Sequence, residues 1–538
     1  MATITFNRFD LGIDHQKGAA VSDANRLIEI KNAHVTSGLA TEKREGLTRV
    51  AVLESGTRGL FAANGVLNTF YCGSGDITHA DTLFKAHKLT STSYPDTALK
   101  DIPFVDLFNG NFYVAATHEN GNTRHYYNGA EITDTNCPHT KVCYKAKSKI
   151  WAVGKDGDTV RYCKTSDCTN WSEADDAGFL PTGMNARGAK EIRAIGMYQN
   201  KMCFLTHDSV QVWTVDPDPT ANSLDSIVEN VGSSFSRSLA TVSGDLYFLS
   251  DYGFRSITTY SLTYQLGDVD IGTPIDDIVR AVIRNRGDFE PLTIYFYGTG
   301  KYLCAIGRQV FVYSVSRTAK IAAWSRYELP VTVDCWAELE GVLYLRSGDT
   351  VYKLDEDAYY DDTGELQWHD TVTVDNRQYD VDNETVVYNG ERYPVINDSA
   401  IIENVPYPVT RNAYSTPVPE CFEVVIQIPY MNFKKPGVLK QIYGIDIDID
   451  GDCMLSIGTD ANTYSGKFEV DSDDCTITYD NSNEYFTDEV RVAGRTYSGG
   501  ILPIECMGTE FSFRFRCENE KDFRLNALTV YYNDLGVV

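Results

Sequence analysis

The sequence predicts an all-β fold: a β-propeller of about six blades with an additional C-terminal antiparallel β-sandwich or jelly-roll domain. The first observation is a repeated phrase of a polar turn and a short apolar, aromatic strand, followed by another turn and strand. It begins at Asn109, Ser148, Asn200, Ser243, Gly300 and Glu340. The copies recur roughly every 40–55 residues, the period of a propeller blade. The second observation is the composition, since 34 Tyr against 7 Met favours strands.

Blade phrases organise the first two thirds of the chain. Residues 1–50 lack the rhythm and are expected to be an N-terminal lead-in that joins the β core; within them, residues 23–33 fit a short helix or an extended strand. The propeller is predicted over residues 51–355, where a less regular copy at Gly59–Tyr71 makes the count six or seven. Apolar spacing in Ile275–Arg284 predicts one helix, with acidic residues first and basic residues last.

The amino-acid composition changes after residue 355. Residues 356–420 are polar and rich in Asp, Asn and Tyr, which predicts an exposed β-rich insertion or linker. Residues 421–538 contain stretches such as FEVVIQIPYMNF and EFSFRFRCENEK, in which apolar and polar residues alternate as in half-buried strands. This last segment is the predicted C-terminal β-sandwich.

The net charge of −27 bears on partners. An acidic surface repels nucleic-acid phosphates and anionic membranes, so a protein that grips the DNA backbone is not expected. The charge fits simple solubility, or a surface that must not adhere to a passing polyanion. The 13 cysteines show no CxxC spacing and mostly sit within strands, which favours synthesis in a reducing cytosol. A signal peptide and a membrane-spanning segment are not expected.

One stretch imitates a metal-binding loop. Asp446, Asp448, Asp450 and Gly451 match the first half of an EF-hand, but Ile457 stands where the loop needs its bidentate glutamate. Isoleucines alternate with the aspartates, so a strand with one buried face is the favoured interpretation.

The sequence offers no catalytic signature. The nine histidines include no HExxH, and GxSxG, P-loop and GxGxxG motifs are missing. The sequence therefore predicts a protein that is not an enzyme, with no catalytic, cofactor-binding or metal residues. Arg514 and Arg516, at strand spacing, are interpreted as a solvated sheet face or a subunit contact.

Residues 165–171, TSDCTNW, resemble an Asp-box turn, in which an aspartate caps turn amides and a tryptophan packs between blades. Cys168 stands in place of the usual glycine and only one copy is present. The expected role is structural; the alternative is a remnant of a glycan-processing propeller.

Three stretches together carry a family resemblance. Gly12, Asn25, Asn32 and Gly38 lead to Lys43-Arg44-Glu-Gly46; Trp324-Ser325-Arg326 follows a strand; and residues 507–532 form a closing β segment. In these features the chain resembles the tail nozzle or tail-hub proteins of short-tailed bacteriophages (podoviruses), including the packaged-DNA stabilisation type.

The resemblance implies a structural virion protein of the phage tail, made in the host cytoplasm. It implies a homo-oligomeric ring, most often a hexamer, below the portal adaptor (head-to-tail connector) and in contact with tail fibres or tailspikes. Double-stranded DNA would be retained, then pass through the channel during ejection without sequence-specific binding. A propeller glycosidase or lectin that binds host-surface glycans is the alternative, and a bacterial interaction module is a third.

Overall fold

The computed structural model describes residues 2–16, 24–79, 81–173, 175–186, 188–258, 270–362, 364, 366–374, 377–382, 384–396, 399–415, 418–460, 467–480, 485–494 and 500–537. The protein is mostly β, as predicted. The α-helix described over its full length is α2 (Asp276–Asn285), which confirms the helix expected there. Its first turn carries Asp276 and Asp277 and its last turn Arg284, charges that suit the helix dipole.

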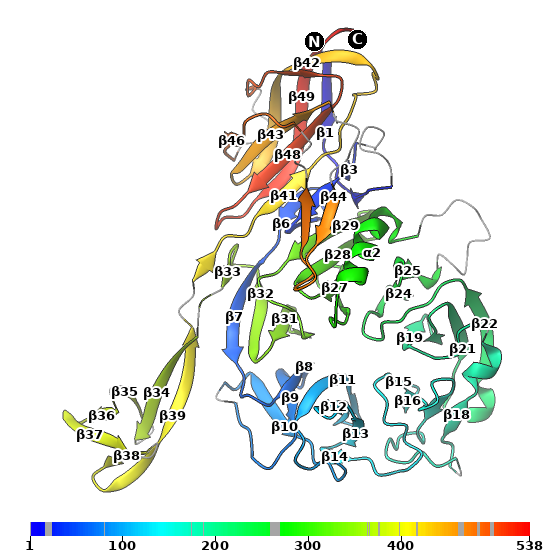
Figure 1. The fold of residues 1–538 in the computed structure, drawn as a ribbon, viewed down its shortest axis with the longest axis vertical. Helices are drawn as coiled ribbons and strands as arrows, with labels where there is room; N and C mark the ends of the chain where they lie inside the picture. Colours follow the sequence, from blue (N-terminus) through cyan, green and yellow to red (C-terminus); the bar gives the residue numbers. More distant parts are fainter. Residues whose placement is uncertain are drawn as a thin grey trace.

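Seven small sheets stand around one axis as propeller blades (Figure 1). Contacts between the first strands of successive blades close the ring, with β30 against β8. The blades, in chain order, are β8 (Arg58–Ala63), β9 (Val66–Tyr71) and β10 (Phe84–Lys88); β11 (Leu99–Phe108), β12 (Asn111–His118), β13 (Thr123–Tyr127) and β14 (Ala130–Glu131); β15 (Cys143–Ala146), β16 (Lys149–Val153), β17 (Val160–Tyr162) and β18 (Gly178–Leu180); β19 (Ala194–Tyr198), β20 (Lys201–Leu205), β21 (Ser209–Thr214) and β22 (Ser223–Glu229); β23 (Ala240–Val242), β24 (Asp245–Ser250) and β25 (Gly253–Ser256); β26 (Leu292–Phe296), β27 (Lys301–Ile306), β28 (Gln309–Ser316) and β29 (Ile321–Glu328); and β30 (Cys335–Leu339), β31 (Val342–Ser347) and β32 (Thr350–Asp355) with β7 (Gly46–Val52).

The described residues therefore hold seven blades, the higher of the two predicted counts. The extra blade is the irregular copy at Gly59–Tyr71. Its third strand, β10, runs parallel to β9 after a long loop, so this copy lacks the second tight hairpin that marks the others. The last blade takes its outer strand, β7, from the lead-in, which pairs antiparallel with β32 and closes the ring.

The repeated phrase is the first turn and second strand of a blade. Its turns at Asn109-Gly110, Ser243-Gly244 and Glu340-Gly341 have positive φ at both residues, 47° and 81° in the first. Two consecutive positive φ values define the two-residue turn whose twist matches that of antiparallel strands, which explains the asparagine and glycine at these positions. The sequence signal was therefore a hairpin signal.

The lead-in and C-terminal strands build one further sheet and extend the sheet of the sixth blade, and the two sheets share one buried cluster. Ile445, Ile447 and Ile449 on one sheet and Phe513 and Phe515 on the other are at most 1% exposed within it. The strands are β1 (Ala2–Phe6), β2 (Gly12–Ile13), β3 (Arg26–Leu27), β4 (Glu29–Lys31), β5 (Ala33–Val35), β6 (Thr41–Lys43), β41 (Val424–Gln427), β42 (Val438–Asp450), β43 (Cys453–Thr459), β46 (Val490–Val492), β47 (Cys506–Gly508), β48 (Phe511–Cys517) and β49 (Arg524–Val537), beside the hairpin β44 (Lys467–Val470) and β45 (Ile477–Asp480). The alternating aspartates lie on β42, so the strand interpretation is confirmed.

Strand β4 joins the propeller to the C-terminal strands. It pairs in parallel with β29 of the sixth blade at Lys31 and antiparallel with β41 on its other edge, where Ile30 faces Ile426. One sheet therefore runs from that blade into the C-terminal strands, and the described part of residues 23–33 is extended.

The described residues between 361 and 420 form a projecting arm (Figure 1). Its strands close into a small barrel around Val372, Val374, Val386, Ala400 and Ile402, each at most 2% exposed. The arm's strands are β34 (Leu366–Val374), β35 (Arg377–Asp382), β36 (Thr385–Tyr388), β37 (Glu391–Ile396), β38 (Ser399–Ile402) and β39 (Val405–Ser415), with β33 (Asp361–Asp362) and β40 (Pro419–Glu420) paired at its base.

Candidate functional site

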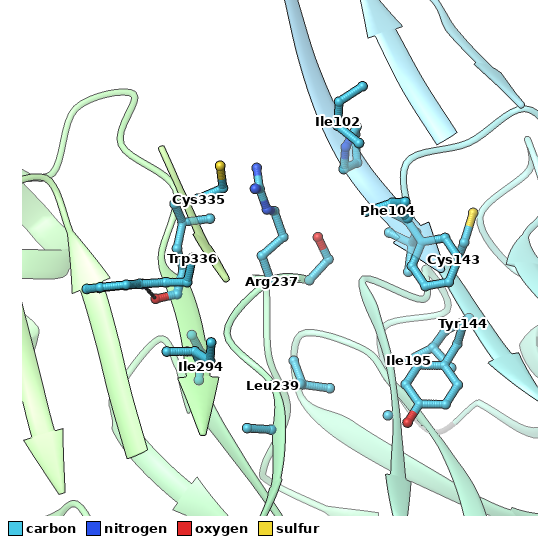
Figure 2. Close-up of a pocket in the computed structure, with 18 of the residues that line it drawn as sticks. Ile102, Phe104, Cys143, Tyr144, Ile195, Arg237, Leu239, Ile294, Cys335 and Trp336 are labelled. Carbon is cyan, nitrogen blue, oxygen red and sulfur yellow. Dashed lines mark hydrogen bonds between the residues drawn. The ribbon is translucent and has the colours of Figure 1, made fainter. Parts of the chain in front are cut away.

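A cavity of about 370 Å³ lies on the propeller axis and is lined by the first strands of the blades (Figure 2). Its wall mixes polar and apolar surface, and Ile102, Phe104, Ile195 and Trp336 are among the residues that line it. Consecutive residues of a first strand, such as 102–105, line the space because the inner edge of each blade borders the axis.

Among the described residues that line the cavity, the charged side chains are those of Lys141 and Arg237, and both are cations. Arg237 reaches into the space between Cys335 and Phe104 (Figure 2). Its Nη1 donates to Asp101 Oδ2 at 3.0 Å, so its charge is already compensated.

The basic doublet of the lead-in lies in the protein interior. Arg44 is fully buried and binds Asp361 through two hydrogen bonds, of 2.8 Å from Nη1 to Oδ1 and 2.5 Å from Nη2 to Oδ2. Its Nε donates to Asn32 Oδ1 at 3.1 Å, and its guanidinium lies over the Phe422 ring at 3.6 Å. Arg44 thus ties the lead-in to the base of the arm and to the C-terminal strands.

Gly46 is required in the same motif. A Cβ there would lie 2.2 Å from the Tyr360 carbonyl oxygen, so no larger residue fits. The sequence located this motif, but the contact partners come from more than 300 residues away and could not be read from it.

The Trp324-Ser325-Arg326 phrase is buried at the same junction. Trp324 stacks on Phe254 with ring centroids 4.6 Å apart, and its backbone lies against Gly12, where a Cβ would be 2.5 Å from the Trp324 carbonyl oxygen. Arg326 pairs with Glu29 at 2.8 Å, and both side chains are under 5% exposed. Two of the three stretches behind the family resemblance therefore meet here.

The third stretch reaches the junction through β49. Arg524 Nη2 donates to Glu42 Oε1 at 2.6 Å, and Leu525 pairs with Thr41 on β6. Lys43 Nζ donates to the Asn519 carbonyl oxygen. All three stretches thus contact one another through the lead-in.

A cavity of about 680 Å³ adjoins this junction. Within its wall, Lys301 pairs with Glu45 at 3.2 Å. Burial opposes the charge on Glu45, but the Lys301 charge, together with weaker charge interactions and hydrogen bonds, lowers the pKa of that carboxyl to about 2. Burial, with Lys301 second, lowers the pKa of His34 to about 3, so that imidazole is neutral at pH 7.

The Asp-box-like turn is structural, as expected. Asp167 Oδ1 accepts hydrogen bonds from the Thr169 amide and hydroxyl, and Trp171 is 1% exposed among residues of the second and third blades. His118 is also structural, with bonds to the Thr97 carbonyl oxygen and the Tyr126 hydroxyl.

Arg516 lies on β48 and pairs with Glu423, Glu489 and Glu518 at 3.3–3.6 Å. Its side chain is 41% exposed, which fits the solvated sheet face that the sequence predicted.

One constellation was missed by the sequence. His125, Cys137 and His139 bring their nitrogen and sulfur atoms within 4.8 Å of one another inside the second blade. Cys137-Pro-His139 was the available signal, but His125 lies on another strand and only the fold brings it close.

Comparisons with known proteins show no family for this chain. No family model and no curated protein matches the sequence. A chain of a mitotic checkpoint complex crystal structure shares 11% identity over 58% of this chain and 93% of its own, with a TM-score of 0.32. The WD40 β-propeller domain of Doa1 shares 10% identity over 65% of this chain and 94% of its own, with a TM-score of 0.31. The blade count and closure rest on the strand pairings described above.

The described residues contain no helix that is both long and apolar enough to cross a membrane.

Proposed function

We propose that the chain is a structural, non-enzymatic subunit of a short-tailed bacteriophage tail. Six copies form a nozzle or hub ring below the portal adaptor, retain the packaged genome and let it pass during ejection. Each subunit consists of the propeller, the arm and a C-terminal β-sandwich over residues 421–538.

The observation that carries the proposal is the junction. Residues 12–46, 324–326 and 507–532 are far apart in sequence, and each resembles part of the tail nozzle proteins. They meet at one junction, where Arg326 pairs with Glu29 in the interior and Arg524 pairs with the partly exposed Glu42. The stretches that resemble that family thus form the packed connection between the propeller and the C-terminal strands. A ring subunit needs such a rigid connection, because movement between its two parts would change the shape of the ring.

Charge supports the same function. An excess of 75 acidic over 48 basic residues creates a negative field that keeps the DNA backbone from adhering to the protein. The proposed DNA path lies between copies of the subunit, and the blades serve as walls of that path.

The arm supplies a surface for tail fibres or tailspikes. Four large apolar residues of its barrel are between 39% and 52% exposed: Val387, Ile396, Ile401 and Val405.

Negative-stain imaging of the purified full chain, with and without its portal adaptor, tests the proposal. The expected result is a ring with a central opening, and a lumen that is net negative in a refined map. A persistent monomer that cleaves or binds a glycan on an array would overturn it in favour of the glycosidase or lectin. A lumen lined by Lys and Arg would refute the argument from charge.

A further inference from the structure

Two histidines and a cysteine converge inside the second blade. His125 lies on β13, and Cys137 and His139 lie on the loop between β14 and β15. His125 and Cys137 are at most 1% exposed. The Cys137 sulfur is 3.3 Å from His125 Nδ1 and 3.8 Å from His139 Nδ1.

These distances match the edges of a zinc tetrahedron. Zinc binds thiolate sulfur at about 2.3 Å and imidazole nitrogen at about 2.0–2.1 Å, which places sulfur and nitrogen ligands about 3.5–3.6 Å apart. The two observed separations lie on either side of that value. We propose that His125, Cys137 and His139 form a zinc site, which no sequence motif of this chain announces.

The hydrogen bonds around His125 point the same way. Its Nε2 donates to the Thr140 carbonyl oxygen at 2.8 Å, so Nδ1 carries the free lone pair. Two donors compete for that one lone pair: the Tyr113 hydroxyl at 2.7 Å and the Cys137 thiol at 3.3 Å. A zinc ion bound to deprotonated Cys137 takes up the lone pair, and the thiol proton passes to solvent.

The bond to Thr140 already sets the ring for a metal. A ligating histidine commonly donates its other N–H to a carbonyl oxygen, which fixes the tautomer. His139 Nδ1 accepts from the His125 backbone N–H at 3.2 Å and would exchange that bond for the metal. His139 is the least buried of the three residues, so its side of the cluster provides the entry path.

The site would act as a clip between blades. His125 also lies beside Trp171 of the third blade, with ring centroids 6.5 Å apart, and its Nε2 is 3.6 Å from the Cys143 sulfur on β15. A bound ion would tie β13 to the loop that leads into the third blade. The buried Tyr113 hydroxyl lies 2.7 Å from His125 Nδ1 and borders the remaining coordination position.

The test uses the untagged full chain, purified under reducing conditions and incubated with Zn²⁺ before gel filtration. Mass spectrometry of the metal should find about one zinc per chain. Replacement by Co²⁺ should give the near-ultraviolet charge-transfer band of a cobalt–thiolate bond together with the visible bands of a tetrahedral ion.

Variants locate the ion. Cys137→Ser and His139→Ala should each weaken zinc binding at least about tenfold, whereas Cys72→Ser, in the first blade, should bind zinc as the parent chain does. If a variant fails to fold, the cobalt spectrum of the parent chain decides alone. No cobalt–thiolate band, or equal zinc retention in all variants, would leave a neutral hydrogen-bonded cluster and overturn the proposal.

Discussion

Removal of one partner from the buried Arg44–Asp361 pair should release the arm and the C-terminal strands from the lead-in. Arg44 is fully buried and Asp361 is 4% exposed, so either charge left alone has neither solvent nor a counterion. Breaking a buried pair in this way costs about 3–5 kcal/mol. Asp361→Asn also weakens the bond that Asp361 Oδ1 accepts from the Leu47 amide at 3.0 Å. We therefore expect Asp361→Asn and Arg44→Met each to lower the free energy of unfolding by that amount.

Urea unfolding followed by tryptophan fluorescence measures the effect, with the first transition compared because a chain of this size need not unfold in one step. The matched control is Arg193→Ala, which removes an exposed pair with Glu191 and should cost at most about 1 kcal/mol. The double variant Arg44→Met/Asp361→Leu should recover much of the loss, since no charge stays buried. Equal shifts for Asp361→Asn and the control would refute the reasoning.

Three further outcomes are expected. Gly12→Ala should lower the free energy of unfolding by at least about 1–3 kcal/mol, because φ is +60° and the new Cβ would meet the Trp324 backbone. Gly65→Ala should cost less, because a Cβ there meets open space. The urea midpoints of the two variants test this difference. His34 should make the free energy of unfolding fall as the pH drops from about 6.5 to about 3, by up to about 1.4 kcal/mol per pH unit. Burial lowers the pKa of His34 to about 3 in the folded protein, so the unfolded chain takes up the proton first. Melting temperatures measured over a pH series should fall less steeply in this range for His34→Gln than for the parent chain. Trp171→Ala should cost about 3–5 kcal/mol by leaving a cavity between blades, whereas a change under 1 kcal/mol in calorimetry would contradict that packing.

The sequence predicted hairpins and half-buried strands well, because each depends on residues that are close together in the chain. A turn such as Asn109-Gly110 announces a hairpin by itself, and the isoleucines of β42 announce a half-buried strand by alternation. The seventh blade was uncertain because β10 reaches β9 through a long loop and a parallel pairing, which leaves no tight-turn signal.

Long-range partners could not be predicted in the same way. Arg44 stood out only as part of a short basic motif, and only the fold shows that Asp361 neutralises it. The His125, Cys137 and His139 cluster was invisible because its residues do not follow a known metal spacing. Resemblance to a family located the junction, but the contacts that make it a junction depend on pairings across the whole chain.

The strand β7 has a consequence for synthesis on the ribosome. It lies near the start of the chain, yet its partner, β32, is made about 300 residues later. At roughly 5–20 residues per second, β7 waits about 15–60 s with an unpaired edge. The propeller therefore cannot close its ring while the blades emerge, and closure becomes a late event that depends on an early segment. A nascent chain that loses β7 to another partner during that wait would complete every hairpin and still fail to become a ring.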